Sequence, residues 1–349
     1  MDRVPRHLSQ HERAEQLRLV TDSATVTLHE AMDSSRNREV LDALRRELDG
    51  VGDAAWLADV KSGADYDWRA LFERLEGADA SDRTVGAVET LAERIERPYP
   101  SLLRLRVDPD TDLDFAPGQY ATIRARGTPR AYSIANAPSE AELEFAIRRV
   151  PGGRLTSDLF VSVRVGDEVV VRGPNGDMVL NDPSPRDAVF LATGTGVAPF
   201  KSMIDHLFEQ GWDDHGGETR DVWLFLGCGW RDDLPYREAF EALDRERPNF
   251  HFVPTLTRES LLTDWDGETD YVQQVFVKYL AASALEGVDL PDRLEPFRDA
   301  EPARDISARI DPAEANVYAC GITAMVETLV GAARSVGVPD RHMQFEGFG

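Results

Sequence analysis

The pattern of apolar residues changes at about residue 187, and this change restricts the chain to few folds. From there, strand-like runs alternate with segments of helical periodicity: AVFLATG with APFKSMIDHLFEQG, VWLFLGC with YREAFEALDRER, then HFVPTLT, and NVYACG with TAMVETLVGAARSVG. Such alternation is typical of a doubly wound parallel sheet with helices on both faces. We predict an α/β domain over residues 183–349, with an acidic, proline-containing surface insertion near 281–310.

The segment before this domain has another pattern. Between residues 81 and 182, proline and glycine separate short β-rich runs at intervals of roughly ten residues: TVGAVETL, LLRLRVD, YATIRA, LEFAIRRV and DEVVVRGP. Closely spaced short strands are typical of an antiparallel barrel or sandwich. We predict a barrel, so that the whole chain is a multidomain α+β protein.

Residues 1–80 are predicted to form a small helical segment. Ser9 and Glu12 have the spacing of a capping box ahead of RAEQLRLV. Further on, apolar residues recur at helical spacing in two groups that end at glycines: Val40, Leu41, Leu44 and Leu48 before Gly50, and Trp68, Leu71, Phe72 and Leu75 before Gly77. Because the segment holds no ligand cluster, we interpret it as a packing or partner-docking unit.

The charge balance is strongly acidic. The net charge is −24, from 63 acidic and 39 basic residues, and only Lys61, Lys201 and Lys278 are lysines. A surface that repels itself in dilute buffer is tolerated at about 1 M salt, where the Debye length is about 3 Å. We interpret the composition as adaptation to a salt-rich cytoplasm; the alternative is a merely acidic mesophilic protein. No basic face is visible that would neutralise the phosphates of a nucleic acid.

The sequence gives no sign of a membrane span or of a secretory leader. No apolar run approaches the ~20 residues that a spanning helix needs, and MDRVPRHLSQ lacks the features of a signal peptide. We therefore expect a cytoplasmic protein. Cys228 and Cys320 are the only cysteines and cannot supply four thiolates to an iron–sulfur cluster. No metal site is expected, and any electrons must be carried by another group.

Two stretches of the predicted barrel carry residues suited to a phosphorylated, flat ligand. In RAYSIANAP, strand alternation places Arg130 and Tyr132 on one face and Ser133 on the other. Arginine can bind a phosphate and tyrosine can stack on a ring or donate a hydrogen bond. In GGRLTSDL, Gly153 and Thr156 precede Leu159, and glycine N–H groups with a hydroxyl can bind a pyrophosphate. Alone, each stretch also fits an exposed strand or an ordinary loop.

LATGTGVAPF lies between a predicted strand and a predicted helix of the α/β domain. Gly194 and Gly196 form the start of a G-x-G-x-x-G fingerprint, but Pro199 stands where the third glycine is expected. Proline suits the first turn of a helix, because its missing N–H would have no partner there. The loop is therefore either an ordinary turn or a phosphate-binding loop of another type.

Taken in order, these motifs resemble the ferredoxin–NADP reductase superfamily of flavoproteins. FAPGQYATI, RAYSIA, GGRLTSDL, GDEVVVRGPNG, FLATGTGVAPF, VYACG and FEGFG follow one another at about the family's spacing. The resemblance covers about residues 82–349, leaving residues 1–80 and the 281–310 insertion outside it. It implies an FAD-binding barrel followed by an NAD(P)-binding α/β domain.

The resemblance also implies roles for residues of the barrel. Arg130, Tyr132 and Ser133 would hold FAD, with Tyr132 against the isoalloxazine ring or ribityl chain and Arg130 on the pyrophosphate. Gly153 and Thr156 would complete the phosphate site.

In the α/β domain, the resemblance implies a site for the nicotinamide nucleotide. Its pyrophosphate would lie beside Gly194, Thr195, Gly196 and Pro199, and its nicotinamide ring beside Cys320 and Gly321. Glu346 and Phe348 match a family ending of Glu, any residue and an aromatic, although Gly349 follows here. Phe348 would cover the flavin, and Ser133, Cys320 and Glu346 would line the reaction centre.

Four further residues concern the choice between NADP and NAD. Thr257 and Arg258 stand where NADP-using members carry Ser-Arg for the 2′-phosphate, and Tyr271 and Gln273 match their Tyr-x-Gln for the adenine. Against NADP, Thr269 replaces a basic residue and Asp270 adds a negative charge. We favour NADP(H) and keep NAD(H) as the alternative.

The resemblance implies a flavin-dependent oxidoreductase, in which NAD(P)H reduces FAD and electrons pass to a separate ferredoxin or oxygenase component. Two alternatives remain open at this point. The chain could reduce a small molecule such as a free flavin, a quinone or oxygen, or it could be a non-catalytic redox-sensing or electron-delivery subunit.

Overall fold

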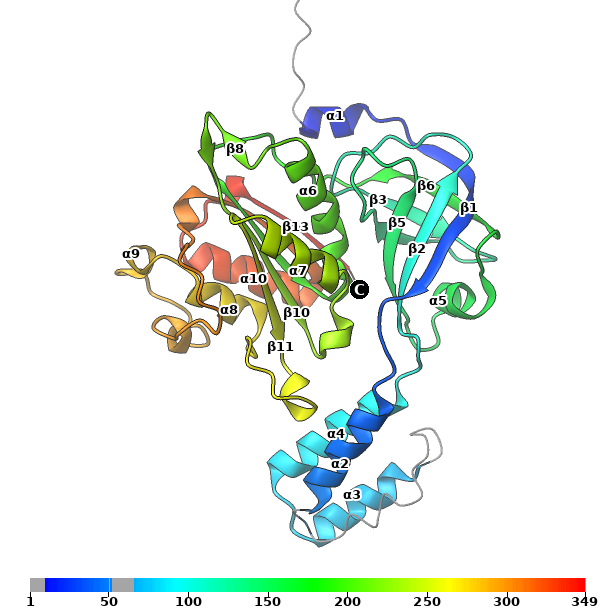
Figure 1. Ribbon diagram of the computed structural model, residues 1–349, viewed down its shortest axis with the longest axis vertical. Coiled ribbons are helices and arrows are strands. Elements are labelled where there is room, and N and C mark those ends of the chain that lie inside the picture. The colour runs from blue at the N-terminus through cyan, green and yellow to red at the C-terminus, as the bar shows by residue number, and fades with distance from the viewer. Residues whose placement is uncertain (1–9, 50, 52–65, 349) are drawn as a thin grey trace, which may run out of the picture.

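The computed structural model describes residues 10–49, 51 and 66–348, which form two β-sheet domains and a group of helices at one end (Figure 1). The expected cap at Ser9, the helix end at Gly50 and the terminal Gly349 lie outside these residues. The short helix α1, Gln10–Gln16, lies beside the barrel, where the Gln10 N–H donates to Asp182 at 3.0 Å.

The first domain is a near-closed antiparallel barrel, as predicted. Its six strands lie in the order β4-β3-β6-β1-β2-β5. Their bounds are Val20–Ala31 (β1), Leu102–Pro109 (β2), Tyr120–Arg124 (β3), Arg130–Ser133 (β4), Leu143–Arg148 (β5) and Glu168–Asn175 (β6). Aliphatic and aromatic side chains that alternate along these strands, such as Val26, Leu105 and Phe145, fill the interior.

Two secondary-structure predictions near the N-terminus are wrong. Val20–Ala31, within the segment predicted to be helical, is the central barrel strand β1, which pairs with both β2 and β6. Conversely, TVGAVETL lies in a helix, α4 (Asp82–Glu96), that the Ser81 hydroxyl caps at the Thr84 N–H. Its apolar residues repeat at helical spacing through Ile95, beyond the short run that suggested a strand.

The helices α2 (Asn37–Asp49), α3 (Trp68–Gly77) and α4 lie between β1 and β2 in the sequence. We call the described part of residues 32–101 the helical insertion. Leu44, Leu71 and Leu91 belong to its apolar core. Trp230 of the α/β domain is buried in the same core, so the helical insertion packs against that domain as well as extending from the barrel (Figure 1).

The second domain is the predicted doubly wound α/β domain. Its five parallel strands lie in the order β11-β10-β7-β12-β13. They are Asp187–Thr193 (β7), Val222–Cys228 (β10), Phe250–Leu256 (β11), Ala315–Ile322 (β12) and Met343–Phe348 (β13), with a small hairpin of Asp214–His215 (β8) and Glu218–Thr219 (β9). The last strand, β13, ends between the two domains (Figure 1).

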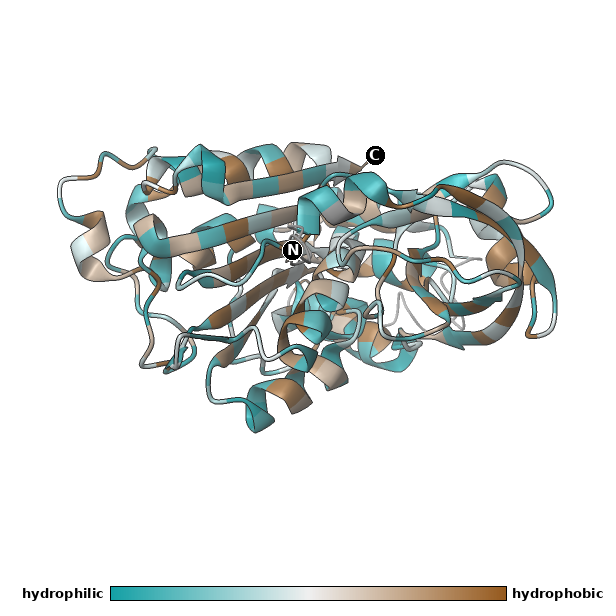
Figure 2. Ribbon diagram, turned by 90° about the horizontal axis from the view of Figure 1, so that it is seen from above, coloured by the Kyte–Doolittle hydropathy of each residue, from teal (hydrophilic) through white to brown (hydrophobic). Residues whose placement is uncertain are grey.

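Helices cover both faces of this sheet, because its strands present apolar side chains to each side. One face packs against α6 (Ala198–Glu209) and α7 (Arg237–Glu246), and the other against α8 (Val272–Lys278) and α10 (Thr323–Ser335). Figure 2 shows the hydrophobic residues of the sheet between these layers.

Residues 281–310 contain the short helix α9 (Ala282–Leu285) and one 3₁₀ turn (Glu295–Phe297). Leu285, Leu294 and Ile310 are buried in the core beneath α8 and α10. The segment expected to be a surface insertion therefore also closes one edge of the domain core.

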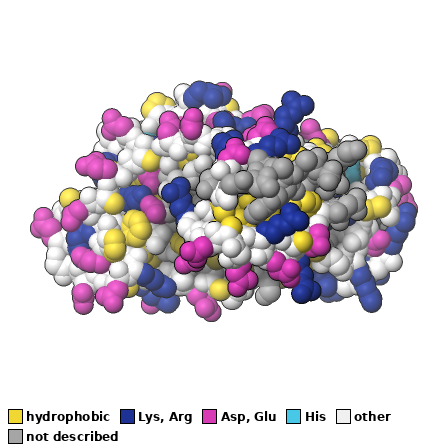
Figure 3. Space-filling view, turned by 90° about the horizontal axis from the view of Figure 1, so that it is seen from below, with side chains coloured by type: hydrophobic (Ala, Val, Ile, Leu, Met, Phe, Trp, Pro, Cys, Tyr) yellow, Lys and Arg dark blue, Asp and Glu magenta, His cyan; other side chains and the backbone are white. Residues whose placement is uncertain are grey.

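On the underside of the molecule, acidic and basic side chains are interspersed over the described residues (Figure 3). None of the helices found in residues 10–49, 51 and 66–348 has the length and apolar composition needed to cross a membrane.

Candidate functional site

A cavity of about 800 Å³ lies at the carboxyl ends of the parallel strands, where open α/β sheets bind ligands. The α/β domain supplies Thr193, Gly194, Thr195, Gly227, Cys228, Thr255, Thr257, Arg258, Tyr271, Ile322 and Phe348 among others. The barrel adds Arg148 and Val150, and the helical insertion adds Glu93, Arg94 and Arg97. All three parts of the molecule thus form its walls.

The GTGVAPF loop forms one wall because it turns tightly at the end of β7. Gly194 has φ +52, a left-handed conformation that glycine adopts without strain, and begins a 3₁₀ turn over Gly194–Val197. Pro199 lies in the first turn of α6. A Cβ on Gly196 would lie 2.4 Å from the Cys320 carbonyl oxygen, so this position has no room for a side chain. Gly194 and Thr195 line the cavity, and Gly196 and Pro199 hold the loop from behind.

Thr193, immediately before this loop, carries a polar atom without a partner. Its hydroxyl oxygen is buried and has no hydrogen bond among the described residues. A Cβ on Gly321 would lie 2.3 Å from that oxygen. An unpartnered hydroxyl beside a glycine-formed turn fits a bound phosphate group, since a buried polar group is normally hydrogen-bonded.

Cys320 and Glu346 face each other in the β12–β13 register, at the end of the sheet nearest the barrel. Cys320 is 1% exposed, and this burial, with the charge of Glu346, raises the pKa of its thiol. Burial, and then the charge of Asp177, also raises the pKa of the Glu346 carboxyl. Among the described residues that carboxyl has no ion pair or hydrogen bond, while Phe348 lies half-exposed in the cavity wall. Phe348 therefore lines the cavity, whereas Cys320 and Glu346 lie outside its wall.

The RAYS residues lie on β4, at an edge of the barrel sheet. Tyr132 and Arg130 share a face, opposite Ala121 and Ile123 of β3, and Ser133 points to the other face. Tyr132 packs on the barrel core, and burial raises the pKa of its phenol to about 12 despite the nearby charge of Arg130. The guanidinium of Arg130 is exposed and donates to the Pro129 carbonyl at 2.9 Å. The structure records no hydrogen bond between Ser133 and Glu346 within the described residues.

The GGRLTSDL loop is folded onto itself. The Thr156 hydroxyl accepts from the Val150 N–H at 3.2 Å and lies near the carbonyl oxygens of Val150 and Gly153. A Cβ on Gly153 would lie 2.6 Å from the Thr156 hydroxyl oxygen. The glycine and the threonine are thus packed against one another. No residue of this loop lines the main cavity, although Val150 just before it does.

At the far end of the cavity, Thr257, Arg258 and Tyr271 line the wall, whereas Gln273 lies in the first turn of α8 and is not part of it. The ammonium of Lys278 donates to Asp270 at 2.6 Å and to the buried Glu268 at 2.8 Å, so it only partly offsets the carboxylate that we expected to oppose a 2′-phosphate. Arg258 reaches Glu93 of the helical insertion at 3.4 Å.

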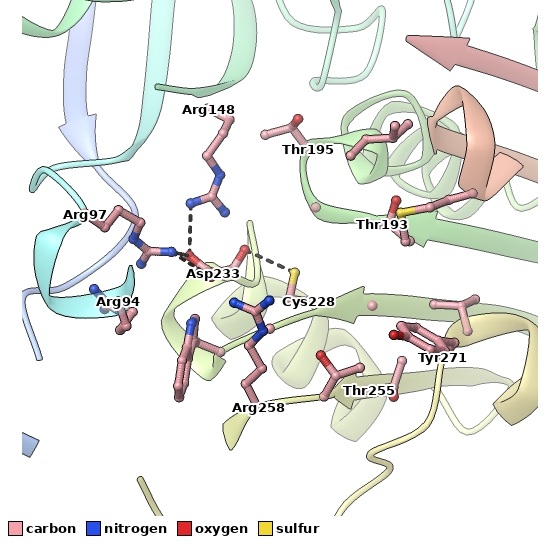
Figure 4. A pocket seen from close by; sticks show the side chains of 18 of the residues that line it. Arg94, Arg97, Arg148, Thr193, Thr195, Cys228, Asp233, Thr255, Arg258 and Tyr271 are labelled. Carbon is pink, nitrogen blue, oxygen red and sulfur yellow. Dashed lines mark hydrogen bonds and ion pairs between the residues drawn. The ribbon is translucent and has the colours of Figure 1, made fainter. Parts of the chain in front are cut away.

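The sequence reasoning missed an ion-pair network at the same cavity (Figure 4). Asp233 accepts from Arg97 at 2.7 Å and from Arg148 at 2.9 Å, and Asp232 accepts from Arg94 at 2.7 Å. Burial would raise the pKa of Asp233, but the two guanidinium groups hold it below its usual value. Arg94 lies in the last turn of α4 and Arg97 directly follows the helix, a signal that the assignment of a strand there concealed.

Cys228, to which the sequence analysis gave no role in the site, lines the cavity. Burial raises the pKa of its thiol to about 12, and the thiol donates to the Asp233 carbonyl at 3.3 Å. Among the described residues, no group of three or more His, Cys, Asp or Glu side chains could hold a metal ion.

The sequence matches two known domain families over these parts. Residues 98–180 match the oxidoreductase FAD-binding domain, and residues 190–330 match the oxidoreductase NAD-binding domain. The boundary between the two matches falls where the barrel meets the α/β domain. The chain belongs to the ferredoxin–NADP reductase superfamily.

Relatives of this superfamily member include the phenol hydroxylase P5 protein of Acinetobacter pittii, which is 33% identical over 184 residues, 52% of this chain and 50% of that protein. The reductase component of a naphthalene 1,2-dioxygenase system from Pseudomonas putida is 28% identical over 255 residues, 73% of this chain and 66% of that protein. The chain spans about half the length of the first relatives that it matches.

Solved structures of the superfamily share the fold. An Amycolatopsis cytochrome P450 reductase has a TM-score of 0.60 at 21% identity, covering 95% of this chain and 71% of that one. A ferredoxin–NADP⁺ reductase from Neisseria gonorrhoeae with bound FAD and NADP has a TM-score of 0.51 at 20% identity, covering 71% of this chain and 93% of that one.

Proposed function

We propose that the chain is an FAD-containing NAD(P)H oxidoreductase that passes electrons to a separate acceptor, such as a ferredoxin or an oxygenase component. The observation that carries this proposal is the cavity at the strand ends, which joins the phosphate loop of the NAD-binding domain to the edge of the FAD-binding barrel. Relatives named as reductase components of monooxygenase and dioxygenase systems support the separate acceptor.

FAD, when bound, supplies the redox chemistry, because a flavin takes up a hydride and can release electrons singly. The chain would contribute binding and orientation. Tyr132 and Arg130 would hold the flavin at β4, with Gly153 and Thr156 shaping the adjoining loop. Ser133, the Cys320 thiol, which its raised pKa keeps neutral, and the Glu346 carboxyl would lie near the reacting rings, and Phe348 would cover the flavin from the cavity side.

The dinucleotide would lie across the strand ends. The backbone of Gly194 and Thr195, with the free Thr193 hydroxyl, would hold its pyrophosphate, while Gly196 and Pro199 keep the loop against β12. Thr257, Arg258 and Tyr271 of the cavity wall would hold the adenosine end. Gly321 lies against Thr193 outside this wall, and its place beside the nicotinamide is proposed from the family resemblance alone. The position of Gln273 outside the cavity wall gives its expected adenine contact no support.

Purified protein tests this function. It should be yellow or become so with added FAD, and should oxidise NADH or NADPH with ferricyanide as the acceptor. A colourless protein that takes up no FAD would contradict the proposal. A protein that reduces a dye but transfers no electrons to an added ferredoxin or oxygenase component would contradict the proposed partner.

We also propose that the protein works in a salt-rich cytoplasm, on the basis of its net charge of −24. Salt screens the repulsion among exposed carboxylates. The melting temperature should therefore rise between 0.1 and about 2 M KCl, and a melting temperature that falls over this range would contradict the adaptation.

A further inference from the structure

We propose that the helical insertion forms part of the dinucleotide site and that its Glu93 is a specificity-determining residue, which acts on Arg258 to disfavour a 2′-phosphate. This inference rests on the proposed function and extends it to the choice of substrate. It concerns a residue outside both matched domains, since Glu93 precedes residue 98.

The cavity is long enough to place the two ends of a dinucleotide far apart. It runs from Phe348 and Ile322 to Thr257 and Arg258, across the ends of β12, β7, β10 and β11. Neighbouring strands are about 4.8 Å apart, so these four strand ends span about 14 Å. Because β13 ends between the domains, beside the barrel, the reactive ring belongs at the Phe348 end. The adenosine ribose therefore belongs at the Arg258 end.

Glu93 stands at that adenosine end. Its carboxylate lines the cavity and reaches the guanidinium of Arg258 at 3.4 Å. The Arg258 chain packs over Gly229, where a Cβ would lie 3.4 Å from its Cδ. A 2′-phosphate that binds Arg258 must compete with Glu93 and approach its like charge, whereas a ribose 2′-hydroxyl can donate a hydrogen bond to the same carboxylate.

Glu93 is also the acidic group of the cavity wall whose pairing a 2′-phosphate on Arg258 would disturb. Three acidic side chains line the wall: Glu93, Asp233 and Asp270. Asp233 is paired with Arg97 and Arg148, and Asp270 shares Lys278 with the buried Glu268. Among the described residues Arg258 is the only ion-pair partner of Glu93, so any group that takes Arg258 leaves this carboxylate unpaired.

The backbone segments that carry Glu93 and Arg258 are held in place. On the same helix, Arg94 pairs with Asp232 at 2.7 Å, with both side chains less than a tenth exposed. The residue after Arg258 is held as well, because Arg36 binds Glu259 through both guanidinium ends at 2.8 and 2.9 Å. The helix and the loop that carry the two charges are therefore tied together, while the side chains of Glu93 and Arg258 are themselves 70% and 46% exposed.

The test compares Glu93→Gln with Glu96→Gln, which removes the same charge from an exposed position on the same helix. Steady-state kcat/KM for NADPH and for NADH is measured with ferricyanide at low salt. We expect Glu93→Gln to raise the NADPH/NADH ratio about fivefold or more, because two unit charges 4 Å apart interact by about 1 kcal/mol even in water. Glu96→Gln should leave the ratio unchanged. An unchanged ratio in Glu93→Gln, or an equal rise in both variants, would overturn the inference.

A second comparison tests whether Glu93 acts through Arg258. In an Arg258→Ala background, Glu93→Gln should change the ratio less than twofold, because the competition for the guanidinium is gone. A full fivefold effect in that background would refute the proposed pair. In the single variant the effect should shrink at 1 M KCl, as expected for exposed charges.

Binding of two nucleotide fragments separates this inference from the proposed function. Calorimetric titration with adenosine 2′,5′-bisphosphate and with AMP needs neither flavin nor acceptor. Glu93→Gln should tighten the bisphosphate severalfold and leave AMP unchanged. If Glu93→Gln tightens bisphosphate binding in a protein that does not oxidise NAD(P)H, the reductase function fails and the inference stands. If NAD(P)H is oxidised but neither the NADPH/NADH ratio of kcat/KM nor fragment binding changes, the inference alone fails. A protein that neither oxidises NAD(P)H nor binds either fragment refutes both.

Discussion

At Gly196, the phosphate loop has no room for even one additional side-chain atom. A Cβ there would lie 2.4 Å from the Cys320 carbonyl oxygen and 2.9 Å from the Gly321 Cα. Backbone atoms of a central strand cannot move aside as a flexible side chain can. The loop and the proposed nicotinamide wall are therefore in direct backbone contact, and a change in one displaces the other.

We expect Gly196→Ala to push this loop away from β12, to destabilise the protein by about 1–3 kcal/mol, and to raise KM for NAD(P)H at least tenfold. Flavin absorbance should remain, since the barrel is not touched. Gly127→Ala is the control, because a Cβ there meets no atom within 4 Å. Equal KM values for the two variants would show that the loop does not hold the dinucleotide.

The residues of the site were predictable to different degrees. The phosphate loop was predictable from a short stretch of sequence, because a strand, a tight turn and a helix follow one another there. This stretch contains Gly194, Gly196 and Pro199. The pairing of Asp270 with Lys278 depends on the fold of α8, whose last residue Lys278 lies beside Asp270 and Glu268, so the isolated sequence overstated that negative charge. Glu93, Arg94 and Arg97 reach the cavity from a segment more than 90 residues before the loops they meet, and local patterns contain no information on such pairing.

At the scale of elements, an ion-pair clamp joins the helical insertion to the α/β domain. Glu259 is fully buried and accepts from Arg36, from the Arg231 N–H at 2.8 Å and from the Thr263 hydroxyl at 3.0 Å. Burial would raise the pKa of the Glu259 carboxyl, but these hydrogen bonds and the charge of Arg36 hold it below its usual value of 4.5. A carboxyl with a lowered pKa stabilises the fold above pH 4.5, and this contribution is lost as the pH falls through the lowered value.

We expect Glu259→Gln to lower the free energy of unfolding by about 3 kcal/mol at pH 7, because it leaves Arg36 partly unpaired in a buried site. The deficit should become smaller as the pH falls below 4.5, because the carboxyl is protonated there in the unfolded wild-type chain while the folded carboxyl stays ionised until its lowered pKa. Glu39→Gln is the matched control, since Glu39 also pairs with Arg36 but is about half-exposed. Denaturant titrations over pH 3–7 measure both, and a deficit that does not depend on pH would contradict this assignment.

The sequence predicted helices and strands correctly where a regular pattern of apolar residues was repeated. The alternation after residue 187 fixed the parallel sheet, because each strand is followed by its covering helix. β1 was misread because its β-branched residues stand alone between helical segments, and its partners β2 and β6 lie far along the chain. α4 was misread because TVGAVETL was judged as a run of eight residues, whereas the helix extends over Asp82–Glu96.

For the whole molecule, the placement of β1 changes how the N-terminal region should be tested. A deletion of residues 1–36 removes a strand from the middle of the barrel and exposes the unpaired edges of β2 and β6. We expect that variant to lose FAD binding and to aggregate. A deletion of residues 1–17 removes α1 but keeps β1, and should retain flavin. FAD content after reconstitution distinguishes the two, and a yellow, monodisperse protein from the longer deletion would contradict the barrel topology.

The place of the helical insertion between β1 and β2 has a consequence for the order of folding. Paired strands usually form early when a short turn joins them, but here about 70 residues separate Ala31 from its neighbour Leu103. Closing that loop as a random chain would slow barrel assembly. The helices α2 and α4 pack antiparallel around Leu44 and Leu91 and bring the chain back to the end of β1. If these helices form early, they hold β1 and β2 together as the short turn of a hairpin would. The barrel would then form at the rate at which these helices associate, and Leu44→Ala should slow the recovery of flavin-binding competence after dilution from denaturant.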